Sequence, residues 1–195
     1  MPSDEIVRAA LERIVSALEE AREELDRLDA VGDDGDHGTK ILQGATAARD
    51  AAAASADGQA LAAAAAAWGA APGHANALWG RMLEAAARAG DGPTATVDAM
   101  LGALEASTDA HIGDKSIVDT LAPALADAHA RLERGEGVAD AAAHAAGVAE
   151  EAAIETAAIE DRFDASNPDL GYPDPGATSS AVVLAAVAEV LAERG

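Results

Sequence analysis

The chain has 195 residues, of which 50% are hydrophobic and only 2% aromatic, and its formal net charge is −22. This length suits one compact domain, residues 1–195, whose core must be filled largely by alanine and leucine. The negative charge argues against a nucleic-acid partner, because no basic patch is present to neutralise phosphates. The absence of cysteine excludes disulfides, thiolate catalysis and zinc–thiolate sites.

The sequence carries no sign of export or of membrane insertion. Its first residues lack the basic region and the apolar run of a signal peptide. The long apolar stretches are rich in alanine and interrupted by Gly, Asp and Arg, which disfavours a membrane span. We therefore expect a cytoplasmic protein that acts away from membranes.

Hydrophobic periodicity and helix-capping residues predict eight helices and no strand. In chain order the helices are expected at about 4–28, 39–55, 59–71, 74–89, 93–107, 115–134, 138–160 and 174–194. The stretch from Asp161 to Pro175 is the longest irregular segment, and long loops in compact domains are usually functional or mobile.

The connections between these helices are mostly short, which favours antiparallel neighbours. The sequence thus predicts an all-α fold, an up-and-down bundle of eight antiparallel helices. The connections after the first, third, fifth and seventh helices contain the motif-like residues, and in such an array they share one end. We expect a functional end built from residues 29–38, 72–76, 108–114 and 161–174.

The most informative stretch is residues 29–38, in which four aspartates and one histidine crowd into a glycine-broken segment. Carboxylates about 5 Å apart repel by roughly 3 kcal/mol per pair at an effective dielectric near 20. A cation among them would remove this repulsion, and oxygen ligands on a loop favour Mg²⁺ or Ca²⁺. An EF-hand is excluded, because the twelfth position counted from Asp29, Asp33 or Asp34 carries no Glu.

Three segments carry a resemblance to a known family. Leu28-Asp29 followed by Gly-Asp-His-Gly at 35–38 resembles the metal loop of the dihydroxyacetone kinase nucleotide-binding (L) subunit, the DAK2 domain. Gly-Asp-Lys-Ser at 113–116 with Asp119, and Asp-Pro-Gly-Ala-Thr-Ser at 174–179, agree with this family in order and spacing. The resemblance implies eight antiparallel helices arranged as a barrel, with ADP or ATP and two Mg²⁺ ions at one end.

The resemblance also implies roles for particular residues. It assigns the metal ligands to Asp29, Asp34 and Asp36 and leaves out Asp33, which stands where the family has Gly. It implies no catalytic side chain, because the metal positions the donor, and it places His37 against the phosphates. The nucleotide contacts that we expect are His37, Gly38, Thr39, Lys40, Gly73, Ala75, Asn76, Gly113, Lys115, Arg162, Asp174, Pro175 and Gly176.

Structural explanations compete with these assignments. An Asp/Gly-rich loop is ordinarily a turn whose carboxylates bond to local amides, and a lone histidine such as His37 is more often structural. Asp174 and Pro175 are good N-cap and first-turn residues of a helix. The same geometry exposes backbone N–H groups to an anion.

Besides Asp33, the chain departs from the family pattern at the start of the fourth helix, in the stretch before Asp174, and after the acidic loop, where Lys40 and Gln43 stand in place of the family's Asn and Arg. The family usually opens the fourth helix with a Gly-Ala-Ser-Gly-Pro-like turn, whereas residues 73–78 read Gly-His-Ala-Asn-Ala-Leu. The phosphate-binding hydroxyl is absent, and the Asn76 side chain or the helix-start amides are its substitutes. Before Asp174 the family carries Gly-Arg-Ala-Ser-Tyr, for which Arg162 is a shifted counterpart, and Tyr172 replaces a usual His.

The resemblance implies the donor subunit of a two-component kinase for dihydroxyacetone or a related short-chain ketose. A separate substrate subunit would hold the ketone through its own histidine. The phosphoryl donor is exchangeable ATP in one branch of the family and a phosphotransferase-system protein acting on bound ADP in another; the residues do not separate these. A homodimer is left open. The alternatives are a non-catalytic nucleotide-sensing regulator, a kinase for a four-carbon ketose, and a bundle stabilised by calcium.

Overall fold

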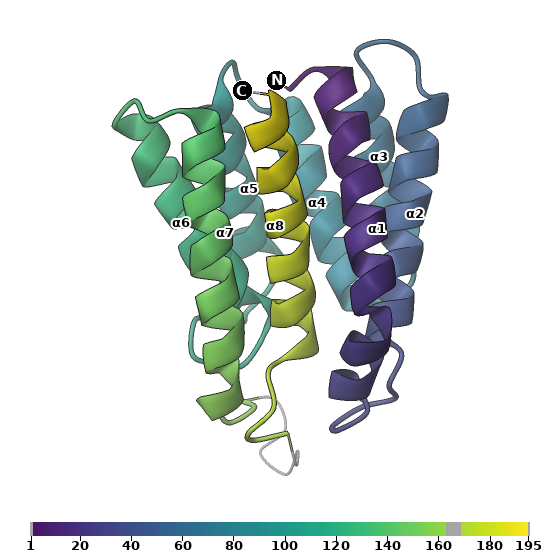
Figure 1. Ribbon diagram of the computed structural model, residues 1–195, viewed down its shortest axis with the longest axis vertical. Coiled ribbons are helices and arrows are strands. Elements are labelled where there is room, and N and C mark those ends of the chain that lie inside the picture. Colours follow the sequence, from purple (N-terminus) through teal and green to yellow (C-terminus); the bar gives the residue numbers. More distant parts are fainter. Residues whose placement is uncertain (1, 163–168, 195) are drawn as a thin grey trace.

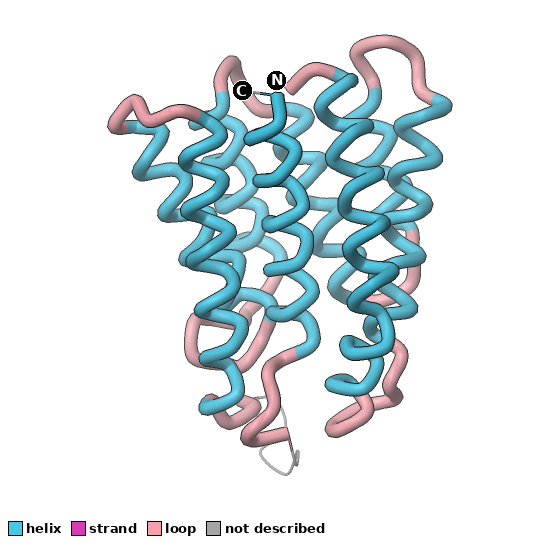
Figure 2. The backbone as a smooth tube through the Cα atoms, viewed as in Figure 1, coloured by secondary structure: helices cyan, strands magenta, loops and turns pink. Residues whose placement is uncertain are grey.

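The computed structural model describes residues 2–162 and 169–194, and in this part of the chain all regular structure is helical (Figure 2). The elements are α1 (Asp4–Asp29), α2 (His37–Ala54), α3 (Ala60–Ala70), α4 (His74–Arg88), α5 (Pro93–Ser107), α6 (Ile117–Glu133), α7 (Val138–Glu155), the 3₁₀ turn η1 (Thr156–Ala158) and α8 (Pro175–Arg194). The predicted all-α fold with eight α helices is confirmed. Part of the predicted irregular segment, residues 163–168, lies outside the described residues.

Consecutive helices run antiparallel and pack as neighbours, and α8 packs against α1, which closes the ring (Figure 1). The helix α8 also contacts α6, so α7 lies toward the outside of the ring. Both chain ends are at one end of the bundle, and the connections after α1, α3, α5 and α7 are at the other (Figure 1). The predicted up-and-down topology is thus confirmed.

The helix ends follow from local capping, and one predicted boundary was wrong. Ser116 and Asp119 form a reciprocal capping box at the start of α6, and Pro93 occupies the first turn of α5. The seventh helix was predicted to reach residue 160, but α7 ends at Glu155 and continues only as η1. The Thr156 hydroxyl donates to the carbonyl oxygen of Ala153 at 2.6 Å at this boundary.

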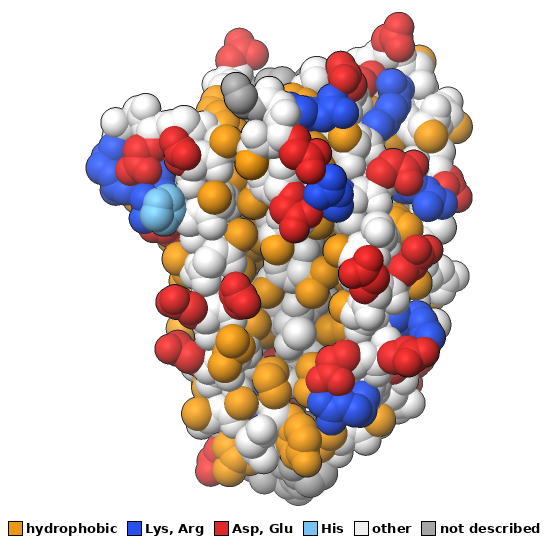
Figure 3. All heavy atoms as spheres, in the orientation of Figure 1, with side chains coloured by type: hydrophobic (Ala, Val, Ile, Leu, Met, Phe, Trp, Pro, Cys, Tyr) orange, Lys and Arg blue, Asp and Glu red, His pale blue; other side chains and the backbone are white. Residues whose placement is uncertain are grey.

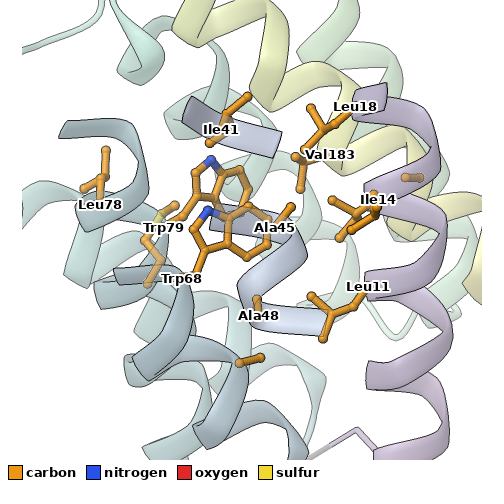
Figure 4. Close-up of a cluster of buried hydrophobic side chains, with 14 of the residues drawn as sticks. Leu11, Ile14, Leu18, Ile41, Ala45, Ala48, Trp68, Leu78, Trp79 and Val183 are labelled. Atoms are coloured by element: carbon orange, nitrogen blue, oxygen red, sulfur yellow. The ribbon is translucent and has the colours of Figure 1, made fainter. Parts of the chain in front are cut away.

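The centre of the bundle contains two stacked tryptophans surrounded by small and branched side chains (Figure 4). The ring centroids of Trp68 and Trp79 are 5.6 Å apart, with an interplanar angle of 24°. Ile41, Ala45 and Val183 lie near them from α2 and α8. Because α2, α3, α4 and α8 all contribute, this core fixes the relative positions of the helices whose ends form the site described below.

Small residues allow α3 and α4 to approach closely. A Cβ atom on Gly80 would lie 2.7 Å from the backbone nitrogen of Gly69 and would overlap its Cα atom. Such contact is possible only without a side chain at this crossing. The alanine-rich sequence of α3 therefore serves tight helix packing.

Charged side chains occupy the outer faces of the helices, with acidic residues frequently beside arginines (Figure 3). Arg13, for example, contacts Glu189 and donates to Glu193 at 2.8 Å, which links α1 to α8. Exposed pairs of this kind contribute little to stability. The surplus of negative charge is therefore spread over solvated faces.

The helix α8 is long and apolar enough to cross a membrane by length and composition alone, and it is the one such helix among the described residues. It packs against α1, α6 and α7 within the bundle. A core helix passes the same test, so this composition is explained by packing.

Candidate functional site

The acidic loop brings the three predicted metal ligands together. Asp29 is the last residue of α1, Asp34 lies in the loop, and Asp36 precedes α2. Each offers one carboxylate oxygen, and these three atoms lie within 4.8 Å of one another. Asp29 is held in place because its Oδ2 atom accepts from the backbone N–H groups of Asp36 at 2.9 Å and His37 at 3.1 Å. The loop thus presents converging oxygen ligands, as a hard divalent cation requires.

A fourth aspartate, Asp26, supports this arrangement from one turn earlier in α1. Its Oδ1 atom accepts from the backbone N–H of Thr39 at 2.9 Å, and its Oδ2 atom accepts from the Thr39 hydroxyl at 2.8 Å. Asp36, although it is the N-cap residue of α2, makes no capping bond with its side chain. Side chains from α1 therefore satisfy the start of α2, and the Asp36 carboxylate is not used for capping.

These contacts change the interpretation of two predicted nucleotide contacts. Both hydrogen-bonding groups of Thr39 are committed to Asp26, so a nucleotide contact by this side chain does not fit the geometry. A Cβ atom on Gly38 would overlap the carbonyl oxygen of Arg22, so this glycine is required by the close approach of α2 to α1. Sequence reasoning missed Asp26, because its partner lies 13 positions away and no motif spacing marks it.

The ammonium group of Lys40 lies among the carboxylates. Its Nζ atom is 2.5 Å from Oδ1 of Asp36 and 3.4 Å from Oδ2 of Asp34. Hydrogen bonds to these two carboxylates raise the pKa of Lys40. A hydrogen bond with the Asp36 carboxyl, followed by the contact with Lys40, lowers the pKa of Asp34. Lys40 thus supplies a positive charge where the acidic loop needs one.

A pocket of about 150 Å³ joins the acidic loop to the start of α4. Its walls combine carboxylates, one histidine, one lysine and the backbone of the turn before α4. They are formed by Asp29, Asp33, Asp34, Asp36, His37, Lys40, Ile41, Gly73, His74, Ala75 and Asn76. The connections after α1 and α3 therefore meet at one site, as their alternation in the sequence predicted.

His37 lies on the inner side of this pocket. Its Nε2 atom is 2.9 Å from the hydroxyl oxygen of Ser179 on α8. Burial is the main cause that lowers the pKa of His37, against the opposing effect of Asp29 and Asp26. The lowered pKa favours the neutral imidazole, which can form a hydrogen bond with a ligand through one of its ring nitrogens. The motif at 174–179 included Ser179, but its contact with a residue 142 positions away was not foreseen.

Asn76 proves to be a core residue that shapes the α4 turn. It is 1% exposed, and its Oδ1 atom accepts from the indole N–H of Trp68 at 2.9 Å. Its Nδ2 atom donates to the carbonyl oxygens of Lys40 at 2.9 Å and Pro72 at 2.6 Å. The predicted phosphate contact by this side chain does not fit. No side chain caps α4 after Gly73, however, so the helix-start amides remain the anion-binding element there.

Lys115, another predicted nucleotide contact, is buried among protein acceptors. It is 4% exposed, and its Nζ atom donates to the carbonyl oxygens of Asp169 at 2.9 Å, Tyr172 at 3.0 Å and Ile159 at 3.2 Å. It also pairs with the Asp169 carboxylate at 3.3 Å. The ammonium is saturated by protein acceptors, so a nucleotide contact does not fit. Lys115 instead fastens the segment before α8 to the start of α6.

The remaining predicted contacts lie at the same end of the bundle but do not line the pocket. Arg162 donates to Oδ2 of Asp114 at 2.5 Å and to the carbonyl oxygen of Asp109 at 3.1 Å. Asp174 caps α8 by accepting from the backbone N–H of Ala177 at 2.6 Å, and burial raises its pKa to about 7. Of the other predicted residues, Gly113 lies on the connection between α5 and α6, and Pro175 and Gly176 are the first two residues of α8.

Comparison with known families matches residues 30–189 to the DAK2 domain, and the chain therefore belongs to the DAK2 domain family. The resemblance to the nucleotide-binding (L) subunits of dihydroxyacetone kinases, inferred from the three motifs, is thereby confirmed. The match covers the acidic loop from its second residue and extends into α8.

Two kinases from other bacteria are similar to most of this chain. The chain is 36% identical over 202 residues to the D-erythrulose kinase of Mycolicibacterium smegmatis, covering 94% of this chain and 35% of that protein. It is 33% identical over 213 residues to the L-erythrulose kinase of Pectobacterium atrosepticum, with the same two coverages of 94% and 35%. The chain thus spans about a third of the length of these relatives.

A solved structure has the same fold. The dihydroxyacetone kinase from C. freundii, in a crystal structure with AMP-PNP and Mg²⁺, matches with a TM-score of 0.75 at 22% identity. The match covers 96% of this chain and 34% of that chain. At this level of identity the likeness establishes the helical fold.

Proposed function

We propose that this chain is the phosphoryl-donor part of a ketose kinase: it binds ADP or ATP with Mg²⁺ and presents the nucleotide to an acceptor held elsewhere. The observation that carries this proposal is the convergence of three carboxylates beside the uncapped start of α4. Carboxylates hold Mg²⁺, and helix-start amides hold phosphate. The site therefore combines the two elements that a metal nucleotide needs.

The donor set fits magnesium. Asp29, Asp34 and Asp36 provide hard oxygen ligands, and their unfavourable proximity is balanced only partly by Lys40. Two ligands of one octahedral Mg²⁺ are at most about 4.2 Å apart, since each metal–oxygen bond is about 2.1 Å. The carboxylate oxygens all lie within 4.8 Å of one another, so small side-chain movements would bring them onto Mg²⁺; following the family resemblance, we propose two ions. When bound, the metal neutralises the phosphates and the charge that develops during transfer.

The other side chains of the pocket position the nucleotide. Lys40 has a flexible side chain that is 36% exposed, so it can move from Asp36 to a phosphate once the metal takes its place. His37, fixed by Ser179, presents a neutral imidazole to the pocket. We assign this chain no general base and no nucleophile; its contribution is positioning and charge neutralisation.

The acceptor belongs to another part of the kinase. Because the chain spans only 35% of its kinase relatives, the remaining part of such a protein is available to hold the ketose. The relatives' names favour a short-chain ketose, either dihydroxyacetone or the four-carbon erythrulose. We propose that residues 1–195 form the donor domain and that a substrate-binding subunit completes the enzyme in the cytoplasm. ATP is the proposed donor, with a phosphotransferase-system protein as the alternative.

A second function, nucleotide sensing without transfer, is favoured by one observation. The α4 turn lacks the hydroxyl of the family pattern, and Asn76 is turned into the core instead. A site with fewer phosphate contacts would bind nucleotide but release it readily. Such a chain would report nucleotide levels to a partner protein.

An assay of phosphoryl transfer distinguishes the donor function from the sensing function. The matching region of the M. smegmatis D-erythrulose kinase can be replaced by this whole chain, and the chimera assayed with ATP, Mg²⁺ and either erythrulose or dihydroxyacetone. Formation of the ketose phosphate, abolished by Asp34→Ala, is the result expected of a donor domain. Metal-dependent nucleotide binding by the chain without any product would instead support the sensing function.

A further inference from the structure

Large exposed apolar side chains are concentrated at the end of the bundle that carries the acidic loop. Five such side chains are exposed within residues 2–162 and 169–194, and four of them are at this end. These four residues, here named the apolar end patch, are Ile112 (66% exposed), Ile154 (63%), Leu170 (55%) and Tyr172 (42%). The fifth, Val138 (43%), begins α7 at the opposite end. Figure 3 shows apolar side chains gathering at the lower end of α7 and of the segment before α8.

The segments that carry the patch are fastened to one another. Lys115 binds three carbonyl oxygens of the connection before α8 with its buried ammonium, including those of Asp169 and Tyr172. The backbone N–H of Gly171 donates to the carbonyl oxygen of Ala157 at 2.8 Å, beyond the end of α7. Arg162 bonds to Asp114 and thereby joins this connection to the one before α6. The patch is therefore held in place by polar bonds beneath it.

Holding apolar side chains in water in this way has a cost that folding alone does not explain. Large apolar side chains exposed together at one end of a protein can mark an interaction site. Aromatic and large aliphatic side chains at the centre of an interface supply most of its binding energy. The fixed presentation of Leu170 and Tyr172 also limits the conformational entropy lost on association.

The position of the patch indicates what covers it. The proposed donor pocket lies at the same end, between the acidic loop and the start of α4. The contact of His37 with Ser179 joins that pocket to α8, and the connection before α8 carries Leu170 and Tyr172. An acceptor must reach the terminal phosphate from this end, so the protein that holds the acceptor must cover it.

We propose that the apolar end patch is the docking surface for the acceptor-holding part of the kinase. This inference rests on the proposed donor function. The chain spans only about a third of its kinase relatives, which leaves a larger part of such a protein to occupy this end. The occupant presents a largely apolar face to Ile112, Ile154, Leu170 and Tyr172 and brings the ketose to the neighbouring pocket.

The test uses charge placed in the patch and an equal charge placed away from it. In the chimera described above, Leu170→Glu and Ile154→Glu alter the patch through two different segments, and Val138→Glu is the matched control. The rate constant kcat/KM for erythrulose is measured at saturating ATP. Mg·ADP binding by each isolated 195-residue variant is measured by calorimetry, and the sedimentation of the isolated wild type is recorded.

The expected result is a decrease of tenfold or more in kcat/KM for the double variant Leu170→Glu/Ile154→Glu, since interface centres tolerate a buried charge poorly. The control should stay within about twofold, and Mg·ADP binding should be unchanged in all variants. Unchanged activity of the double variant in an active chimera would overturn the docking surface alone, whereas an inactive chimera whose isolated chain binds Mg·ADP would support the sensing function and overturn both proposals. A dimer of the isolated chain that Leu170→Glu dissociates would assign the patch to a second copy and also overturn it. Failure of the wild type to bind Mg·ADP would instead contradict the donor function.

Discussion

The ammonium of Lys40 lies 2.5 Å from Oδ1 of Asp36, so the chain's own cation sits at the edge of its acidic cluster. Two consequences follow for Lys40→Met, which keeps the aliphatic length and removes the charge. Mg²⁺ alone should bind more tightly, because a competing cation is gone. Mg·ADP should bind more weakly, by about three- to thirtyfold, because a phosphate contact is lost.

Calorimetric titrations with MgCl₂ and then with Mg·ADP test this prediction. The matched control is Arg49→Met, which removes one positive charge from an arginine that pairs with Asp50 on the outer face of α2. A fall in both affinities in Lys40→Met would mean that Lys40 only supports the loop.

Asn76 should be required for stability rather than for chemistry. Asn76→Leu removes the partner of the Trp68 indole N–H and the donor to the carbonyls of Lys40 and Pro72. Each buried group left unpaired costs about 1–3 kcal/mol. We expect a decrease of roughly 2–5 kcal/mol in the free energy of unfolding, measured by urea denaturation. A variant as stable as the wild type would show that this network contributes nothing.

The α3–α4 crossing should not tolerate a methyl group. Gly80→Ala places a Cβ atom 2.7 Å from the Gly69 nitrogen and forces the two backbones apart, at a cost of about 1–3 kcal/mol. Gly102→Ala is the matched control, since its Cβ would meet no atom within 4 Å on the helical part of α5. The control should gain up to about 1 kcal/mol from helix propensity. Thermal and chemical denaturation should show that Gly80→Ala lowers the free energy of unfolding and that Gly102→Ala raises it. A Gly80→Ala variant as stable as the wild type would contradict the tight crossing.

Asp174 should make stability depend on pH in an unusual direction. Burial raises its folded-state pKa from 3.8 to about 7, so the folded protein favours the protonated carboxyl. The contribution of Asp174 to the stability of the protein is then highest below pH 4, and it decreases as the pH rises to about 7. The decrease is at most about 4 kcal/mol, since one pKa unit corresponds to about 1.4 kcal/mol.

Asp174→Asn isolates this effect, because asparagine keeps the oxygen that caps Ala177 and cannot ionise. The variant should be more stable than the wild type at pH 8 and nearly equal to it at pH 4. Urea denaturation at the two pH values measures both differences. Equal stability at pH 8 would show that the carboxylate is well solvated in the folded state.

The sequence predicted the fold well because alanine-rich helices with clear periodicity leave few alternatives. It also placed Asp29, Asp34 and Asp36 correctly in one cluster, since they share a short loop. The sequence did not reveal which polar side chains would make all their hydrogen bonds within the protein. Lys115 and Asn76 looked like ligand contacts by position, yet both are buried among protein acceptors.

The buried contacts of these two side chains have a common physical cause. The partner of a buried polar group is set by tertiary packing, as with Ser179 and His37, which are 142 positions apart. Burial of an unpaired polar group is costly, so the fold recruits nearby carbonyls wherever they are available. Motif spacing identifies the segment that approaches the site but not the direction of each side chain.

Metal-dependent nucleotide binding at the acidic loop is the central property proposed for this chain. The direct test is calorimetric titration of ADP with Mg²⁺ and then with EDTA, on the wild type, Asp34→Ala and the control Asp33→Ala. The account predicts binding by the wild type and by Asp33→Ala that EDTA removes, and no binding by Asp34→Ala. Equal binding by all three proteins, or binding that persists in EDTA, would contradict it.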